Sequence, residues 1–198
     1  ANAHKGTFGK TLIVSGSTLY TGAPILAATA AYRAGAGLVT LAAPQSIHAI
    51  MASKIDEATF RPLPDQSGVL SAEAATEIRD LLETYDVALI GPGLTTEARS
   101  FIAAFLALKI STALVLDADA LNCLAAIDQW WTQVTSTAIL TPHPGEMSRL
   151  TKLSLANRTV VLLVCAILIG LGFFATGSLK QELIPSIETP AATIVAVQ

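Results

Sequence analysis

Four short polar segments of the chain hold the residue types that could bind a ligand or carry chemistry. His143 lies in the last of them, between two prolines that restrict the backbone, so we expect its side chain to be held in place. Asp117 and Asp119 could hold a hard cation, although capping of the next helix is the commoner role for Asp119. The segments are Ser15-Gly16-Ser17, Gly91-Pro92-Gly93, Asp117-Ala118-Asp119 and Pro142-His143-Pro144-Gly145-Glu146.

The glycines of these segments allow two interpretations, and the pattern leaves both open. Gly16, Gly22, Gly91 and Gly93 are typical of tight turns, which glycine serves by its conformational freedom. They also leave backbone amides uncovered, so that a phosphate could approach the N-terminus of the following helix.

Other candidate motifs indicate packing or surface positions. Gly9-Lys10-Thr11 is not a phosphate-binding P-loop, because His4 stands where the first glycine is required and the motif precedes a strand. The glycine fingerprint of a Rossmann dinucleotide site is absent after the first strand. We expect surface positions for His4 and His48, the edge of the core for Trp130 and Trp131, and reduced, packed thiols for Cys123 and Cys165.

Short apolar runs alternate with longer amphipathic stretches, which predicts the elements that position these segments. Near-continuous apolar strands alternating with helices favour an α/β fold with a mainly parallel sheet covered on both faces. Each polar segment follows a strand, so we expect all four at the carboxyl edge, where such sheets bind ligands. Strands are expected at 11–15, 38–42, 58–63, 86–90, 113–116 and 137–140, helices at 24–34, 45–53, 72–84 (capped by Ser71), 97–109, 119–126 and from 146, and a loop at 62–68.

The composition excludes some functions and divides the chain in two. Only 14% of the 198 residues are charged, the net charge is −3 and no basic run occurs, which argues against a disordered chain and against a nucleic-acid partner. Residues 1–158 hold 24 of the 27 charges, and residues 159–179 hold none. We therefore expect a domain over 1–150 and an apolar tail over 151–198. The chain does not begin with Met, so we expect it to start inside a longer product.

Seven short motifs occur in order along the first 150 residues. They are HKGTFG (4–9), GS (16–17), YTGAP (20–24), RAGAGL (33–38), GPGL (91–94), LDADALN (116–122) and TPHPGE (141–146). Over about residues 4–150 they resemble the ATP/ADP-dependent NAD(P)H-hydrate dehydratase family of the ribokinase-like superfamily. The resemblance implies a ribokinase-like fold, and an enzyme that uses ATP or ADP, with Mg²⁺, to return hydrated NADH or NADPH to NAD(P)H.

The resemblance also implies roles for three residues of this chain. Ala23, Gly93 and His143 correspond to contacts with the hydrated dinucleotide: Ala23 and Gly93 would permit close approach, and His143 would hydrogen-bond to it. It further implies a cytoplasmic enzyme that forms a homo-oligomer. No membrane partner is expected.

The C-terminal part departs from the family. The family ends its site with a Gly-Thr-Gly-Asp motif whose aspartate is the catalytic base, yet no Asp follows Asp128 in this chain. Among three explanations for the tail, we favour a truncated or frame-shifted product over a membrane anchor at Val160–Phe174 and over a diverged core element. We therefore expect impaired activity and an incomplete or altered C-terminal part. The alternatives are a non-catalytic dinucleotide-binding protein and a ribokinase-like small-molecule kinase.

Overall fold

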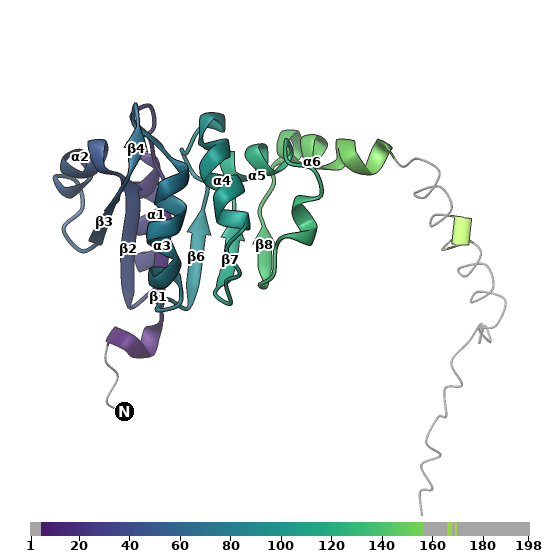
Figure 1. The fold of residues 1–198 in the computed structure, drawn as a ribbon. Coiled ribbons are helices and arrows are strands. Elements are labelled where there is room, and N and C mark those ends of the chain that lie inside the picture. Colours follow the sequence, from purple (N-terminus) through teal and green to yellow (C-terminus); the bar gives the residue numbers. More distant parts are fainter. Residues whose placement is uncertain (1–4, 157–165, 168, 170–198) are drawn as a thin grey trace, which may run out of the picture. The chain divides into compact units, whose positions relative to one another are not determined.

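The computed structural model describes residues 5–156, 166, 167 and 169, and its central element is a six-stranded sheet (Figure 1). The strand order is β3-β2-β1-β6-β7-β8, and every neighbouring pair is parallel, which confirms the predicted α/β architecture. The strands are β1 (Lys10–Val14), β2 (Leu38–Pro44), β3 (Thr59–Leu63), β6 (Val87–Ile90), β7 (Ala113–Leu116) and β8 (Ala138–Leu140).

Helices cover both faces of the sheet, as predicted. Side chains of α3, α4 and α5 form one core cluster with the sheet, and side chains of α1 and α2 form a second cluster on the other face. The helices are α1 (Ala23–Arg33), α2 (His48–Ala52), α3 (Ala72–Leu82), α4 (Arg99–Leu106), α5 (Asp119–Leu124) and α6 (Pro144–Ala156), with short 3-10 helices η1 (Lys5–Phe8), η2 (Gln45–Ile47), η3 (Thr96–Ala98) and η4 (Trp130–Thr132).

The strand order creates a switch point between β1 and β6. From β1 the chain proceeds outward through β2 to β3, and it then returns to the other side of β1 and proceeds through β6, β7 and β8. Loops after β1 and β6 therefore diverge to opposite sides at the carboxyl edge. In open α/β sheets this divergence produces the crevice in which ligands bind.

The segment 62–68 is not the simple loop predicted from its polar composition. It completes β3, and β4 (Asp65–Gln66) then pairs antiparallel with β5 (Val69–Leu70). Asp65 stabilises the connection, because its two carboxylate oxygens accept hydrogen bonds from the amides of Gly68 and Ser46. This short hairpin rests on the loop after β1, where Thr18 N donates to Gly68 O at 3.1 Å.

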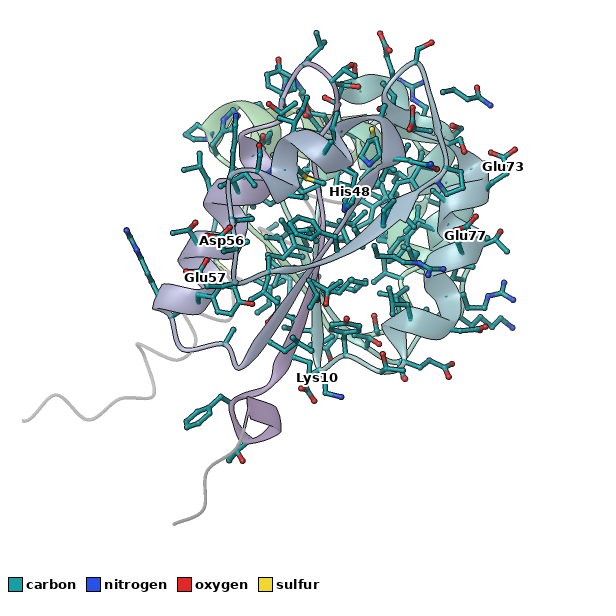
Figure 2. The ribbon with its side chains drawn as sticks, turned by 90° about the vertical axis from the view of Figure 1, so that its left-hand side faces the viewer. Lys10, His48, Asp56, Glu57, Glu73 and Glu77 are labelled. Atoms are coloured by element: carbon teal, nitrogen blue, oxygen red, sulfur yellow. The ribbon has the colours of Figure 1, made fainter. Side chains whose placement is uncertain are left out.

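Helix α3 shows how an amphipathic stretch is placed on the sheet. Glu73 and Glu77 lie on its outer side (Figure 2), and the apolar residues at helical spacing are buried. Ser71 occupies the predicted N-cap position, but its side chain accepts no amide hydrogen bond. Its hydroxyl donates to the carboxylate of Glu73 instead, and this bond lowers the pKa of Glu73.

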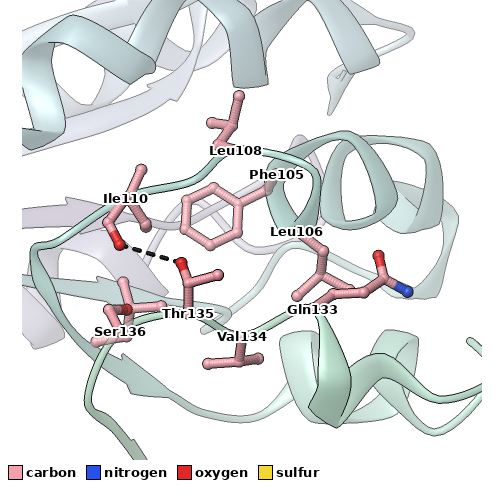
Figure 3. Close-up of a pocket in the computed structure, with 9 residues that line it drawn as sticks. Phe105, Leu106, Leu108, Ile110, Gln133, Val134, Thr135 and Ser136 are labelled. Carbon is pink, nitrogen blue, oxygen red and sulfur yellow. Dashed lines mark hydrogen bonds between the residues drawn. The ribbon is translucent and has the colours of Figure 1, made fainter.

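A small void lies inside the first core cluster, between α4 and the segment before β8 (Figure 3). Its volume is about 10 Å³, which is near the minimum for one water molecule and excludes a ligand. Ser136, one of its lining residues, has a buried hydroxyl without a protein partner. The void is therefore a packing feature rather than a binding site.

The predictions for the tail fall largely outside the described residues, among them the segment Val160–Phe174 and the thiol of Cys165. Within the described residues, no helix has the length and apolarity needed to cross a membrane. The chain divides into two compact units after Ser154. The predicted boundary at residue 150 stays a prediction.

Candidate functional site

The loops after β1 and β6 are joined to each other at the switch point. Gly16 N and the hydroxyl of Ser15 both donate to the carbonyl oxygen of Pro92, the former at 2.9 Å. Gly91 N donates in turn to Val14 O at 3.1 Å. These bonds hold the glycine segments that the sequence singled out in one fixed arrangement.

Ala23 and Gly93, two of the three predicted substrate contacts, lie against each other in this arrangement. Gly93 has φ +70°, and a Cβ built on it would lie 2.8 Å from the Cβ atoms of both Ala23 and Tyr20. Both the backbone conformation and the available space therefore require glycine. The turn explains Gly93 structurally, and its approach to a ligand stays a prediction.

An open groove of about 600 Å³ begins at Ala23 and continues along α1. Ala23, Pro92 and Asp117 line its end at the carboxyl edge of the sheet. Its volume and its mostly apolar lining, with one carboxylate, are typical of small-molecule sites. The remaining lining residues are Leu26, Ala27, Ala30, Ala31, Ala34 and Leu89.

Asp117 and Asp119 have different partners, and neither caps α5. Asp117 Oδ1 accepts a hydrogen bond of 2.8 Å from the hydroxyl of Thr141, which joins the loops after β7 and β8. Asp119 is the first residue of α5, and its oxygens accept from Thr95 N and from Asn122 Nδ2. The predicted N-cap role of Asp119 is wrong, because the chain turns at Ala118, with φ +51°, and the helix starts at Asp119 itself, one residue earlier than an Asp119 cap requires.

The described residues contain no cluster of three or more His, Cys, Asp or Glu side chains that could hold a metal ion. Asp117 is the carboxylate that faces the groove. Magnesium is commonly held by one or two carboxylates together with the phosphates of a nucleotide, and Asp117 is compatible with that arrangement.

His143 and Glu146 form a capping box at the start of α6. The ring Nδ1 of His143 accepts a 3.0 Å bond from Gly145 N, and Glu146 Oε2 accepts a 3.1 Å bond from His143 N. Glu146 Oε1 also lies 3.2 Å from His143 Nε2. Pro144 begins the helix, where its missing N–H has no consequence. His143 is therefore held in place, as the flanking prolines predicted.

The remaining candidates lie away from the groove lining. His48 packs edge-on against Phe60, with ring centroids 5.3 Å apart, and Trp130 packs against the core, whereas Trp131 is half exposed. Cys123 is a buried free thiol, and burial raises its pKa to about 11. His4 lies outside the described residues.

Three site features escaped the sequence analysis. These are the bond from Thr141 to Asp117, the support that the hairpin gives to Thr18, and the buried hydroxyl of Ser17, which has no protein partner. Each depends on residues distant in sequence, or on burial, so no local pattern indicated it. The S/T-x-x-E form of a capping box would have identified Glu146 only if histidine had been allowed as the cap.

Comparison with known proteins gives consistent matches. The family model described as NAD(P)H-hydrate dehydratase matches residues 11–169. The chain is 43% identical over 152 residues to the bifunctional NAD(P)H-hydrate repair enzyme of Moorella thermoacetica, and 40% identical over 153 residues to that of Salinibacter ruber. These alignments cover 76% and 75% of this chain but 29% and 28% of the two enzymes.

Solved structures agree on the fold. The ADP/ATP-dependent NAD(P)H-hydrate dehydratase of Bacillus subtilis, co-crystallized with ATP and Mg²⁺, is 32% identical with a TM-score of 0.60. A Streptococcus mutans protein of hypothetical function is 32% identical with a TM-score of 0.63. The matches cover 77% and 76% of this chain, and 50% and 52% of those chains. A ribokinase-like superfamily protein of Enterococcus faecalis matches with a TM-score of 0.61 at 25% identity.

Proposed function

The chain belongs to the NAD(P)H-hydrate dehydratase family, and we propose on this basis that its groove is the dinucleotide half of a cofactor-repair site. The reaction is the ATP- or ADP-dependent dehydration of hydrated NADH or NADPH, (S)-NADHX or (S)-NADPHX. The observation that carries the proposal is the contact of Ala23 with Gly93 at the switch point, where the groove opens.

Ala23, Gly93 and His143 are the proposed substrate contacts. Ala23 lines the groove directly, and Gly93 packs against Ala23 and Tyr20 beside it. His143 follows Thr141 by two residues, and Thr141 is hydrogen-bonded to the groove residue Asp117. The loops that carry these residues follow neighbouring parallel strands and lie at the same carboxyl edge of the sheet, which supports one binding site for them.

The nucleotide and Mg²⁺ belong to the same proposal. Hydroxide is a poor leaving group, so transfer of the terminal phosphoryl group of the nucleotide to the substrate hydroxyl would release the shortened nucleotide and the hydroxyl proton. Loss of phosphate together with a proton of the neighbouring ring carbon would then restore NAD(P)H. Such transfer depends on positioning and on charge neutralisation, which Mg²⁺ supplies when bound with the phosphates. Asp117 is the groove carboxylate placed to orient that ion.

A second candidate, non-catalytic binding of the dinucleotide, is favoured by one sequence observation. Asp128 is the last aspartate of the chain, so the catalytic base expected from the family motif has no counterpart here. A small-molecule kinase would need the same base, and the segment 141–146 resembles the dehydratases more closely. We therefore propose that the 198-residue chain binds the hydrated dinucleotide and that its turnover is impaired.

Cytoplasmic location and homo-oligomerisation complete the proposal. Both rest on the family resemblance. We propose neither a nucleic-acid partner nor a membrane partner. The net charge of −3 and the lack of a basic run argue against a nucleic-acid partner.

Calorimetric titration of (S)-NADHX into the chain, with and without ATP, tests the proposal. We expect NADHX to bind, and Ala23→Leu, at the carboxyl-edge end of the groove, to weaken binding about tenfold or more. The matched variant Ala34→Leu, at the opposite end of the lining, should bind NADHX as the unmodified chain does. Absence of NADHX binding, or equal loss in both variants, would contradict a substrate site at the switch point.

A separate assay of NADH formation distinguishes the two candidates. Binding of NADHX with little or no ATP-dependent formation of NADH would support the second candidate function, non-catalytic binding of the dinucleotide. Turnover at a rate normal for the family contradicts the impairment.

A further inference from the structure

Both ring nitrogens of His143 are engaged within its own helix cap. Because Nδ1 accepts a hydrogen bond from Gly145 N, it carries no proton, and the neutral ring must carry its proton on Nε2. The Nε2 atom lies 3.2 Å from Glu146 Oε1. The cap therefore selects one tautomer as well as one ring orientation.

Gly145 supplies the space for this arrangement. A Cβ on Gly145 would lie 2.9 Å from Cε1 and 3.3 Å from Nδ1 of the His143 ring, closer than side chains normally pack. Any larger residue there would push the ring away from the amide to which it is bonded. Gly145 and Glu146 therefore both lie against the ring.

The side chains of His143 and Glu146 differ in solvent exposure, and this difference determines which of them a ligand can reach. The side chain of His143 is 63% exposed, whereas that of Glu146 is 6% exposed. A ligand atom that accepted a hydrogen bond from Nε2 would have to approach beside the carboxylate of Glu146, which lies 3.2 Å from this nitrogen. The exposed part of the imidazole can be covered by a ligand without breaking the hydrogen bond from Gly145 N.

We propose that Glu146 is a positioning residue that holds His143 as the neutral Nε2–H tautomer, so that His143 offers its ring face to a flat aromatic ring of the ligand. In the dinucleotide of the proposed function, on which this inference rests, the flat aromatic ring is the adenine, because the hydrated nicotinamide ring is partly saturated and no longer aromatic. The contact is then stacking rather than the hydrogen bond to a ring nitrogen that the family resemblance suggested.

Nitrogen NMR of the ¹⁵N-histidine-labelled chain tests the positioning without any ligand. His143 should be the Nε2–H tautomer in the unmodified chain, with its signals assigned by their loss in His143→Ser. Glu146→Gln should reduce the population of this tautomer, because one amide group cannot accept from both His143 N and Nε2. An Nδ1–H tautomer in the unmodified chain, or an unchanged tautomer in Glu146→Gln, would overturn the proposal.

Affinity for (S)-NADHX tests the ring-face contact. His143→Ser keeps a good N-cap but removes the ring, and should weaken binding on the order of tenfold. His143→Phe keeps a ring face without nitrogens and should retain more affinity than His143→Ser. Stronger binding by His143→Asn than by His143→Phe, each measured at full folding, would show a hydrogen bond and overturn the stacking contact.

Gly145→Ala separates positioning from simple helix stability. Alanine is the better helix former, so the variant should unfold no more easily than the unmodified chain. Displacement of the ring should nevertheless weaken NADHX binding severalfold, and unchanged affinity would contradict the role given to the cap.

If the unmodified chain fails to bind NADHX while the tautomer is as expected, the proposed function fails and the positioning by Glu146 stands.

Discussion

Glycines with the same left-handed backbone have different surroundings in this chain, and the difference separates turn positions from packed ones. Gly35 has φ +99° with no neighbouring atom within 4 Å of a built Cβ, whereas Gly93 has φ +70° and close neighbours in Ala23 and Tyr20. The sequence allowed two interpretations of a glycine, as a turn residue or as a residue of close approach. Gly35 fits only the first, because nothing lies near it, whereas Gly93 fits both.

Substitution by alanine should resolve the two kinds of glycine. Gly35→Ala introduces backbone strain alone and should lower the free energy of unfolding by about 1–2 kcal/mol. Gly93→Ala adds overpacking against Ala23 and Tyr20, which typically costs about 1–3 kcal/mol more. Urea denaturation of both variants checks this order. Equal losses would indicate that the packing at Gly93 is looser than the distances imply.

Cys123 predicts a pH dependence of stability. Burial, and then the negative charge of Asp119, raise the pKa of its thiol from 9.0 to about 11. A raised pKa in the folded state means that the stabilising contribution is complete below pH 9 and is lost as the pH rises toward 11. Cys123→Ala should therefore show a smaller fall in unfolding free energy over this range, measured by urea denaturation. The unmodified chain is the reference, and an equal fall of the unfolding free energy in Cys123→Ala would contradict the assignment to Cys123.

At the scale of elements, the β4–β5 hairpin supports the loop that leads into α1. A Cβ on Gly68 would lie 2.1 Å from Cγ2 of Thr18, so the two segments are in direct contact. The hairpin is itself held by Asp65, which bonds Gly68 N and Ser46 N. A polar segment expected to be a simple loop is thus a support for the candidate substrate site.

The contact between these elements can be measured by a double-mutant cycle. Gly68→Ala alone should destabilise the fold because of the clash with Thr18 and the φ of +80° at Gly68. Thr18→Gly removes every atom of the clash and should restore part of the loss, with a coupling free energy of about 1 kcal/mol or more. Strictly additive losses would show that hairpin and loop do not press on each other.

At the scale of the whole sheet, the described residues cover its two faces unequally. Ile90, in β6, is fully buried in the cluster formed with α3, α4 and α5. Ile139, in β8, is 59% exposed, and the groove along α1 lies on the side of Leu89. The apolar groove and the exposed strand residue therefore belong to the part of the sheet that the described helices leave open.

This difference in burial predicts that the same substitution, isoleucine to threonine, lowers the free energy of unfolding by different amounts at Ile90 and Ile139. Ile90→Thr removes buried apolar area and buries a hydroxyl, and should cost about 2–4 kcal/mol of unfolding free energy. Ile139→Thr keeps a β-branched side chain in a strand and should change stability by no more than about 0.5 kcal/mol. Thermal denaturation of both variants checks the expectation. A large loss for Ile139→Thr would mean that this position is covered in solution.

The sequence by itself determined the elements and the edge at which they place the polar segments. Apolar runs separated by amphipathic stretches have few stable arrangements other than a parallel sheet, and the segments after its strands must then gather at one edge. The parallel sheet and its carboxyl edge are confirmed, whereas the segment 62–68, predicted as a loop, completes β3 and forms β4. The strand order, with its switch point between β1 and β6, was not predicted, because periodicity within a strand carries no information about its neighbours.

Only the tertiary structure decided which residues meet. Ala23 contacts Gly93, Thr18 contacts Gly68 and Thr141 bonds to Asp117 across long stretches of chain. The partners of His143 are close in sequence, yet its tautomer depends on the buried position of Glu146 and on the space left by Gly145. Local patterns report propensity and amphipathicity, whereas these contacts depend on how separate elements pack, which is settled only when the whole sheet is assembled.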